Sequence, residues 1–342
     1  MKAMRLRQQA SIHGRPLEPA DLPAPEPGPG ELRVRVRACA ICRTDLHVIE
    51  GDLPPRRLPL VPGHQVVGIV EALGPECARV RPGDRVGIAW LRYTCGTCVF
   101  CRSRQENLCE ASRYTGYHED GGYAELAVAP EAFVYPIPPA FSDLQAAPLL
   151  CAGIIGYRAL RRSQVPPGGA LGLYGFGSSA HVVLQIARHR GCRVFVATRG
   201  ERHRALARRL GAEWVGDTYD PVPAPLDSAI VFAPAGEIVP VALRAVRKGG
   251  TVSLAGIHMT PVPTMEYGPC LFHEKTLTSV EANTRADGED LLREAAEIAI
   301  RPEVTTFRLE EANDALIRLK EDRIDGTGVL LVATPPARGD ES

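Results

Sequence analysis

The period of the hydrophobic pattern changes near residue 150. Before that point, Glu31–Ala40 and Gln65–Leu73 alternate apolar and polar residues, and Pro-Gly turns separate such segments. A period of two predicts β-strands with one buried face. Many short strands at this spacing favour a small β-barrel.

After residue 150, strand patterns alternate with helix patterns. Residues 168–199 are predicted to form a strand, a glycine turn, a helix and a second strand, and residues 203–216 add another helix and strand. Apolar strands at 224–234 and 248–256 continue the series. This alternation predicts a doubly wound parallel sheet, and hence an α/β fold class. Amphipathic helices at 290–300 and 309–320 and a last strand at 326–334 close the chain.

Composition narrows the class of protein. The chain has 342 residues, enough for two domains. Forty basic and forty acidic residues cancel, which argues against a nucleic-acid partner. The segment 1–16 has no apolar core typical of a secretory signal, and the apolar stretch 146–160 is interrupted and too short to span a bilayer. We therefore expect a cytoplasmic protein with no membrane partner and reduced thiols.

Four of the ten cysteines lie within sixteen positions, at Cys95, Cys98, Cys101 and Cys109. Two C-x-x-C steps and a fourth cysteine from a short loop suit tetrahedral Zn²⁺ with four thiolate ligands and no open position. A redox C-x-x-C motif is the alternative, but it needs only one pair. Such a closed zinc site organises a loop, so the chemistry is expected elsewhere.

The turn GFGSSA places Gly175, Gly177 and Ala180 in the G-x-G-x-x-G/A pattern of dinucleotide-binding proteins. It follows an apolar strand and opens a helix, where free N–H groups and the helix dipole favour phosphate. We expect Gly175, Phe176, Gly177 and Ser178 to contact the cofactor. The alternative is a tight turn without a ligand.

The end of the next strand normally carries an acid that holds the adenosine ribose. Here that position is Thr198, followed by Arg199. A missing acid beside an arginine favours the 2′-phosphate of NADP over NAD. Alternatively, Arg199 is an ordinary exposed arginine in a chain whose basic residues are nearly all arginine.

A second group of metal-binding residue types includes Cys42 and His64. A catalytic zinc needs three protein ligands and an open position. Spacing alone does not choose the third ligand among five candidates. These are Cys77, His118, Cys151, Cys192 and Cys270.

These motifs together resemble zinc-containing alcohol dehydrogenases of the medium-chain dehydrogenase/reductase superfamily, in particular bacterial proteins similar to cinnamyl-alcohol dehydrogenases. CRTDLH, GHQVVGIVEALG, RPGDRVG, the four-cysteine lobe, DGGYAE, APLLCAGIIGYRAL, GLYGFGSSA and LARRLGA occur in the family's order over essentially the whole chain. The resemblance implies a GroES-like β-barrel catalytic domain over 1–152, with the zinc lobe at about 92–112. It also implies a Rossmann domain over 153–283 and a return to the catalytic domain over 284–342.

The resemblance also implies residue roles. It selects Cys151 as the third catalytic zinc ligand and gives Asp45 a hydrogen bond to a ligand, His64. In these implied roles, Thr44 holds the substrate oxygen and takes the first step of a proton relay, and His47 then passes the proton to solvent. The remaining implied contacts are Arg43, Ala255 and Ile257 with the cofactor, and Trp90 with the substrate. Alternatively, Thr44 and Asp45 only cap a helix, His47 is a surface residue and Trp90 belongs to the core.

Two positions depart from many relatives. Gln65 stands where a glutamate commonly follows the ligand histidine, and Thr327 stands where an arginine commonly contacts the cofactor pyrophosphate. These departures put both contacts in question. We interpret Cys39, Cys77, Cys192 and Cys270 as buried small hydrophobic residues.

The resulting hypothesis is a zinc-dependent alcohol dehydrogenase or aldehyde reductase that uses NAD(P)H, binds two zinc ions per chain and forms a homodimer or homotetramer. One alternative is a zinc-free quinone or enoyl reductase of the same superfamily, which metal analysis would distinguish. Another is a non-enzymatic zinc-binding interaction protein, which a cofactor titration would distinguish.

Overall fold

The computed structural model describes residues 1–332 as two compact units. One unit contains Met1–Cys151 and the described residues from Glu303 to residue 332, and the other contains Ala152–Pro302. Residues 333–342, the end of the expected return segment, lie outside the described residues. No helix in the described part of the chain has the length and apolar character needed to cross a membrane.

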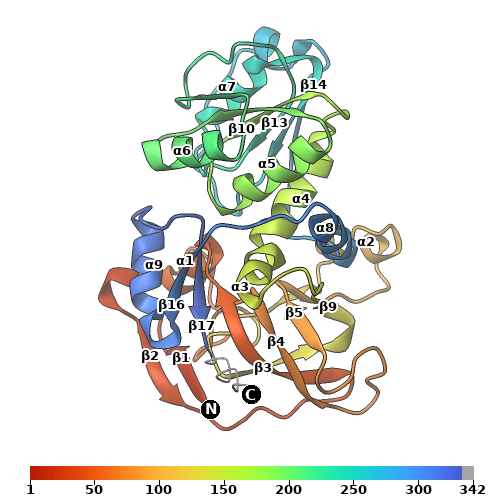
Figure 1. Ribbon diagram of the computed structural model, residues 1–342, viewed down its shortest axis with the longest axis vertical. Coiled ribbons are helices and arrows are strands. Elements are labelled where there is room, and N and C mark those ends of the chain that lie inside the picture. Colours follow the sequence, from red (N-terminus) through yellow and green to blue (C-terminus); the bar gives the residue numbers. More distant parts are fainter. Residues whose placement is uncertain (333–342) are drawn as a thin grey trace, which may run out of the picture. The chain divides into compact units, whose positions relative to one another are not determined.

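The first unit is rich in β-structure, as the period of two predicts. Its seven-stranded sheet has the order β16-β17-β3-β4-β5-β9, with β8 also paired to β3. The strands are β3 (Glu31–Ala40), β4 (Val66–Leu73), β5 (Arg85–Ile88), β8 (Leu126–Pro130), β9 (Val134–Pro136), β16 (Val304–Arg308) and β17 (Thr327–Leu331). Figure 1 shows β17, from the end of the chain, beside β3 from its beginning, and the two pair antiparallel.

The core of this sheet follows from alternation along β3. Leu32, Val34 and Val36 are fully buried, whereas Arg33 and Arg35 pair with Glu71 on β4. Smaller elements complete the unit. They are β1 (Lys2–Leu6), β2 (Leu17–Asp21), β6 (Leu91–Tyr93), β7 (Arg113–Tyr114), α1 (Arg43–Glu50), α2 (Val99–Arg102), α3 (Asp143–Ala146) and α9 (Ala312–Lys320).

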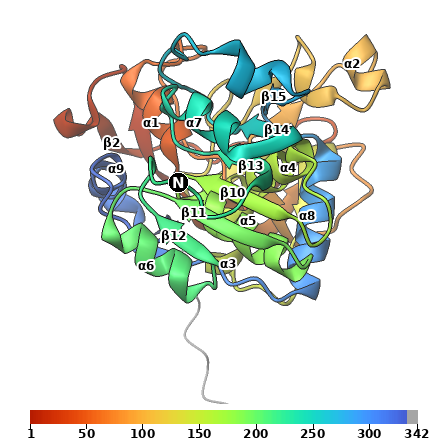
Figure 2. The same cartoon turned by 90° about the horizontal axis from the view of Figure 1, so that it is seen from above.

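The second unit is the expected doubly wound parallel sheet, with strand order β12-β11-β10-β13-β14-β15 and every pair parallel. The strands are β10 (Ala170–Tyr174), β11 (Arg193–Ala197), β12 (Trp214–Gly216), β13 (Leu226–Val231), β14 (Val246–Leu254) and β15 (Thr276–Ser279). The helices are α4 (Ala152–Ser163), α5 (Ser178–His189), α6 (Glu201–Arg209), α7 (Ile238–Ala245) and α8 (Arg285–Glu297). Figure 2 shows β10 and β13 between α5 and α7. Because both faces are covered, β10 is buried along its whole length.

The second unit extends further along the chain than the expected boundary at residue 284. Helix α8, assigned from sequence to the C-terminal return, belongs to this unit. The reason is a buried ion pair: Asp287, 2% exposed, accepts hydrogen bonds from Arg158 at 2.6 Å and Arg161 at 3.1 Å, both on α4. The division therefore falls between Pro302 and Glu303.

Glu131, 7% exposed, connects the end of β8 to the loop before β5. Its carboxylate accepts hydrogen bonds from the N–H groups of Ala78, Arg79 and Val80 at 2.6–3.1 Å. Burial by itself would raise the pKa of Glu131. The three donors and the Arg79 charge outweigh it, so the pKa lies below its ordinary value of 4.5.

Glu131→Gln is therefore expected to lower the free energy of unfolding by about 1 kcal/mol near neutral pH, because the amide loses a charged acceptor. A depressed folded-state pKa contributes stability that is present above about pH 4.5 and is lost as the pH falls through the folded pKa. Chemical denaturation at a series of pH values should show the two proteins converging below pH 4.5. A difference that is constant down to the lowest pH would contradict this role.

Candidate functional site

The four-cysteine lobe brings its sulfur atoms together as predicted. The Sγ atoms of Cys95, Cys98, Cys101 and Cys109 all lie within 4.8 Å of one another. The Cys95–Cys101 distance is 4.0 Å and the Cys98–Cys101 distance is 3.5 Å. Four zinc–sulfur bonds of about 2.3 Å in a tetrahedron place sulfurs about 3.8 Å apart. The lobe therefore fits one zinc ion.

The local backbone of the lobe favours thiolates. The Cys98 N–H donates to Cys95 Sγ at 3.3 Å, and the Cys95 N–H donates to Cys109 Sγ at 3.4 Å. Backbone N–H groups of Thr97 and Cys98, with the Thr97 hydroxyl, lower the pKa of Cys95 to about 6. Gly96, at φ +71°, provides the turn between the first two cysteines. All four thiols are free, so no disulfide competes with a metal.

The second group consists of Cys42, His64 and Cys151. Cys42 precedes the first turn of α1, His64 precedes β4, and Cys151 follows a 3₁₀ turn at Ala147–Leu150. Their ligand atoms lie within 4.8 Å of one another, with Cys42 Sγ 3.3 Å from His64 Nε2. Of the five possible third ligands that spacing left open, the structure brings Cys151 to this group.

The other candidates join neither group in the described part of the chain. Cys192 and Cys270 are buried, as expected, and so is Cys39. Cys77 is only half-buried, and its thiol donates to the Glu31 carbonyl oxygen at 3.1 Å. The interpretation of Cys77 as a buried hydrophobic residue is therefore wrong.

Asp45 both caps α1 and holds His64. Its Oδ2 accepts the Cys42 N–H at 2.8 Å, and its Oδ1 lies 3.1 Å from His64 Nδ1. Both side chains are nearly inaccessible to solvent, at 2% and 1%. A carboxylate on Nδ1 directs Nε2 toward a metal and raises the basicity of the ring. The two readings of Asp45 from the sequence are therefore compatible.

The electrostatics of this group suit a cation. Burial by itself would lower the pKa of His64, but the charges of Asp45 and Cys42 outweigh burial and raise it to about 10. A hydrogen bond from Cys151 lowers the pKa of Cys42 well below its ordinary value, and this donor role, with burial, raises the pKa of Cys151. A positive charge among these atoms is thus stabilised, and metal binding would displace the protons. The donor set fits zinc with three protein ligands.

Thr44 and His47 lie on α1, the helix that begins directly after Cys42. The Thr44 side chain helps to lower the pKa of Cys42. The His47 side chain is 15% exposed, and its Nδ1 lies 2.7 Å from Asp52 Oδ2. Arg43, the first residue of the helix, is exposed.

Trp90 belongs to an aromatic group next to the proposed ligand His64. Its ring meets the His64 ring edge-on at 4.9 Å and stacks on Tyr114 at 4.8 Å and Tyr117 at 5.8 Å. Tyr117 donates to the Pro54 carbonyl oxygen at 2.8 Å. Sequence reasoning missed both tyrosines, although the aromatic run directly after the lobe could have indicated them.

The two positions that depart from relatives are both inside the first unit. Gln65 is completely buried, and its amide atoms find no hydrogen-bond partner among residues 1–332. A neutral amide here adds no charge beside His64. Thr327, 2% exposed, begins β17.

The glycine turn leaves the space that a dinucleotide needs. Gly175 has φ +88°, and a Cβ there would lie 2.9 Å from the Ala233 nitrogen, so the turn requires glycine. Gly177 caps α5 and has no atom within 4 Å of a Cβ position, which leaves an open cradle at the helix N-terminus. Phe176 is buried, and Ser178 is the first residue of the helix. These features fit a pyrophosphate.

The strand ends beside this turn carry the other expected cofactor residues. Thr198, 3% exposed, follows β11, and Arg199 is exposed with no ionic partner among the described residues. Arg204, which sequence reasoning missed, donates to the Thr198 carbonyl oxygen at 3.1 Å and to Asp217 at 3.0 Å. Ala255 and Ile257 follow β14. The carboxyl ends of parallel strands are the usual ligand-binding edge.

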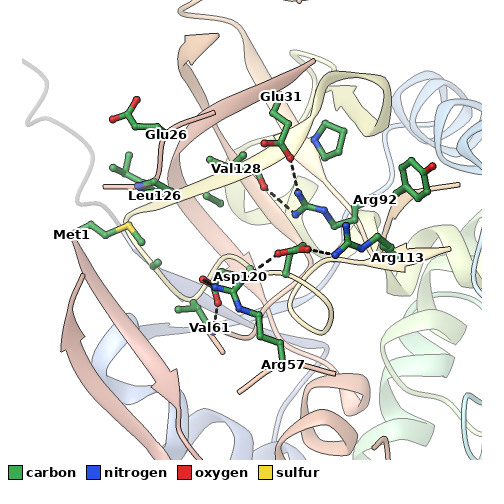
Figure 3. A pocket seen from close by; sticks show the side chains of 17 residues that line it. Met1, Glu26, Glu31, Arg57, Val61, Arg92, Arg113, Asp120, Leu126 and Val128 are labelled. Atoms are coloured by element: carbon green, nitrogen blue, oxygen red, sulfur yellow. Dashed lines mark hydrogen bonds and ion pairs between the residues drawn. The ribbon is translucent and has the colours of Figure 1, made fainter. Parts of the chain in front are cut away.

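One cavity of about 400 Å³ lies in the first unit (Figure 3). Its three arginines already have acidic partners: Arg57 and Arg113 bind Glu119, and Arg92 binds Glu31. None of the cysteines or histidines of the two metal-binding groups lines it. It therefore offers a substrate no unpaired arginine and none of the proposed zinc ligands.

Comparison with known proteins gives consistent matches. Residues 28–139 match the family described as Alcohol dehydrogenase GroES-like domain, and residues 180–297 match Zinc-binding dehydrogenase. The probable alcohol dehydrogenase AdhA of Mycobacterium tuberculosis is 49% identical over 97% of both chains. An alcohol dehydrogenase of Geobacillus stearothermophilus is 36% identical over 93% of this chain and 97% of its own.

Solved structures agree with these sequence matches. A cinnamyl alcohol dehydrogenase from Sorghum bicolor superposes with a TM-score of 0.88 at 29% identity, covering 98% of both chains. A structure described as an NAD-dependent alcohol dehydrogenase superposes with a TM-score of 0.89 at 28% identity, covering 97% of this chain and all of that one.

Proposed function

This chain belongs to the zinc-containing alcohol dehydrogenases of the medium-chain dehydrogenase/reductase superfamily, and we propose that it interconverts primary alcohols and aldehydes at a zinc held by Cys42, His64 and Cys151. The fold expected from the sequence, a GroES-like domain with a Rossmann domain, is confirmed. The proposal for the site rests mainly on one observation: these three ligand atoms lie within 4.8 Å of one another, and Asp45 orients the histidine.

The chemistry divides between the bound groups and the chain. Zinc, when bound, supplies a Lewis acid that polarises the substrate oxygen and lowers the pKa of an alcohol. Nicotinamide, when bound, carries the hydride. The chain provides two thiolates and a neutral imidazole, which balance the charge of Zn²⁺, and the buried Gln65 adds none. Trp90, packed edge-on against His64, lines the substrate side.

Proton transfer is assigned to α1. The Thr44 hydroxyl holds the substrate oxygen and passes a proton from it during alcohol oxidation. His47 accepts this proton and releases it to solvent, and aldehyde reduction reverses the path. The side chain of His47 is 15% exposed, which supports this role because the ring is within reach of both the protein interior and water.

Cofactor binding is assigned to the second unit, with a contribution from Arg43 to the pyrophosphate. Gly175, Phe176, Gly177 and Ser178 form the phosphate cradle, and Ala255 and Ile257 line the edge of the sheet. The absence of an acid at Thr198 and the exposed Arg199 support NADP over NAD. With NADPH, aldehyde reduction is the expected direction in cells.

Further features support a second zinc, cytoplasmic location and self-association. The four-thiolate lobe fits a structural zinc, and ten free cysteines suit a reducing compartment. Strand β15 is an edge of its sheet, and Ile257, Tyr267 and Phe272, more than half exposed, lie in the chain between β14 and β15. An open edge with exposed apolar residues favours pairing with a second copy.

The proposed activity is tested by following nicotinamide absorbance with a panel of aliphatic and aromatic aldehydes and both cofactors. We expect reduction of at least one class of aldehyde, and its loss when a chelator removes zinc. Activity that survives complete metal removal would instead favour a zinc-free reductase of the same superfamily.

His47→Gln is expected to slow turnover by about ten- to a hundredfold, because glutamine cannot take up and release the proton. The loss should be greatest near and below neutral pH. Steady-state kcat across a pH series checks this, with thermal unfolding as the control for folding. An unchanged pH–rate profile would remove His47 from the proton path.

A further inference from the structure

We propose that Asp52 is a positioning residue for proton transfer, which fixes the His47 ring with its proton on Nδ1 and its lone pair on Nε2, the atom that accepts the proton from the substrate side. The observation behind this is the 2.7 Å contact between His47 Nδ1 and Asp52 Oδ2. The inference rests on the proposed function, since it requires His47 in the proton path.

The chain places Asp52 on His47 through the way α1 ends. Gly51 adopts φ +93° after the last helical turn, a conformation that favours glycine. The N–H groups of Gly51 and Leu53 both donate to the His47 carbonyl oxygen, at 3.2 and 3.1 Å. Asp52 therefore lies between two residues tied to the backbone of the histidine that it contacts.

A side chain from another segment fixes this turn. Gln9 Nε2 donates to the carbonyl oxygens of Val48 at 2.7 Å and Leu53 at 2.9 Å. The position of the Asp52 backbone is thus determined from both sides of the turn. An ion pair between two mobile surface side chains would not require hydrogen bonds that fix the backbone in this way.

The two acids of α1 itself have other partners. Asp45 binds His64 and the Cys42 N–H, and Glu50 binds Lys320 at 2.7 Å and the Ile12 N–H at 2.8 Å. Elements packed against α1 bring Lys320, from α9, and His13, which lies 3.9 Å from Glu321. Asp52, by contrast, contacts the His47 ring.

The chemical consequence follows from hydrogen-bonding capacity. An ionised carboxylate only accepts hydrogen bonds, so the Nδ1 facing it carries a proton, and Nε2 then has the lone pair. One proton enters at Nε2 to give an imidazolium, and the ring returns one proton to water. No electrons move in this step. Asp52 is half exposed, at 51%, so this end of the ring is beside solvent.

The kinetic test compares Asp52→Ala with His47→Gln. We expect Asp52→Ala to lower kcat about two- to fivefold, the size of a partly exposed charged hydrogen bond, with little change in KM. Asp52→Glu should restore most of the rate, because it returns a carboxylate. Asp314→Asn is the matched control: it removes an exposed acid paired with Arg15 on the surface, and it should leave kcat unchanged.

A spectroscopic test does not depend on activity. The test is NMR of protein that carries ¹⁵N-labelled histidine, recorded at about pH 9, where an ordinary histidine is neutral. The signals of His47 are those that are missing from the spectrum of His47→Gln. We expect the Nδ1–H tautomer in the wild-type zinc-loaded protein and a mixture of tautomers in Asp52→Ala. Thermal unfolding should give the same melting temperature for both.

The outcomes separate this inference from the function on which it rests. If His47→Gln is slow but Asp52→Ala has wild-type kcat, Asp52 has no role and the relay stands. An Nε2–H tautomer in the wild type also overturns the positioning role. If His47→Gln keeps full activity, the relay itself fails, and the inference fails with it.

Discussion

Cys42→Ser is expected to lower kcat about a thousandfold while changing the melting temperature little. The proposed ligand set loses one of three donors, and a Lewis acid contributes several kcal/mol to such a reaction, with about 1.4 kcal/mol per decade of rate. Cys42 is at the start of α1, where the Asp45 carboxylate accepts its backbone N–H, and this hydrogen bond survives the substitution. Turnover and thermal unfolding of the purified variant check the prediction.

Cys98→Ser is the matched control, because it makes the same chemical change in the other cysteine group. We expect it mainly to lower the melting temperature, since the four-thiolate site organises the loop from Cys95 to Cys109. The assignment of the two sites would be reversed if the Cys98 variant had native stability but no activity and the Cys42 variant remained active.

Arg199→Ala is expected to remove most of a ten- to 150-fold preference for NADPH over NADH in kcat/KM. A hydrogen bond between charged groups contributes about 1.5–3 kcal/mol, which corresponds to about this range. Arg199 follows β11 and has no ionic partner among residues 1–332, so it is available to a 2′-phosphate. Values of kcat/KM with both cofactors measure the change, and NADH kinetics should remain nearly unchanged.

Two further variants sharpen the cofactor test. Arg208→Ala removes an exposed arginine of α6 that pairs with Glu201, and it should leave the cofactor ratio unchanged. Thr198→Asp should move the preference toward NADH by repulsion of the phosphate. A wild-type protein that already prefers NADH would make Arg199 an ordinary surface arginine.

The hydrophobic pattern predicted most of the strands and helices, because each of them depends on residues that are close together in the sequence. The period of two along Glu31–Ala40 gives β3, and the strand–turn–helix pattern gives β10, α5 and β11. The domain boundary was not predictable in this way. The amphipathic pattern of α8 is the same whichever unit it packs on, and its place depends on Asp287 meeting Arg158, 129 positions away.

The candidate site shows the same division. The four cysteines of the lobe are close in sequence, so their spacing predicts that their sulfur atoms meet. Cys151 is far from Cys42 and His64 in sequence, so spacing could not identify it as the third ligand. The turn at Ala147–Leu150 places it beside them. The stacking of Tyr114, on β7, against Trp90, directly before β6, joins residues that no sequence period relates. The contact between His47 and Asp52 is local, but it depends on the left-handed turn at Gly51.

The zinc content of freshly purified, unchelated protein shows whether both groups of ligands hold a metal ion. The two groups of ligands, at Cys95–Cys109 and at Cys42, His64 and Cys151, predict close to two zinc ions per chain by emission spectrometry. Fully active protein with a value near one would contradict the account.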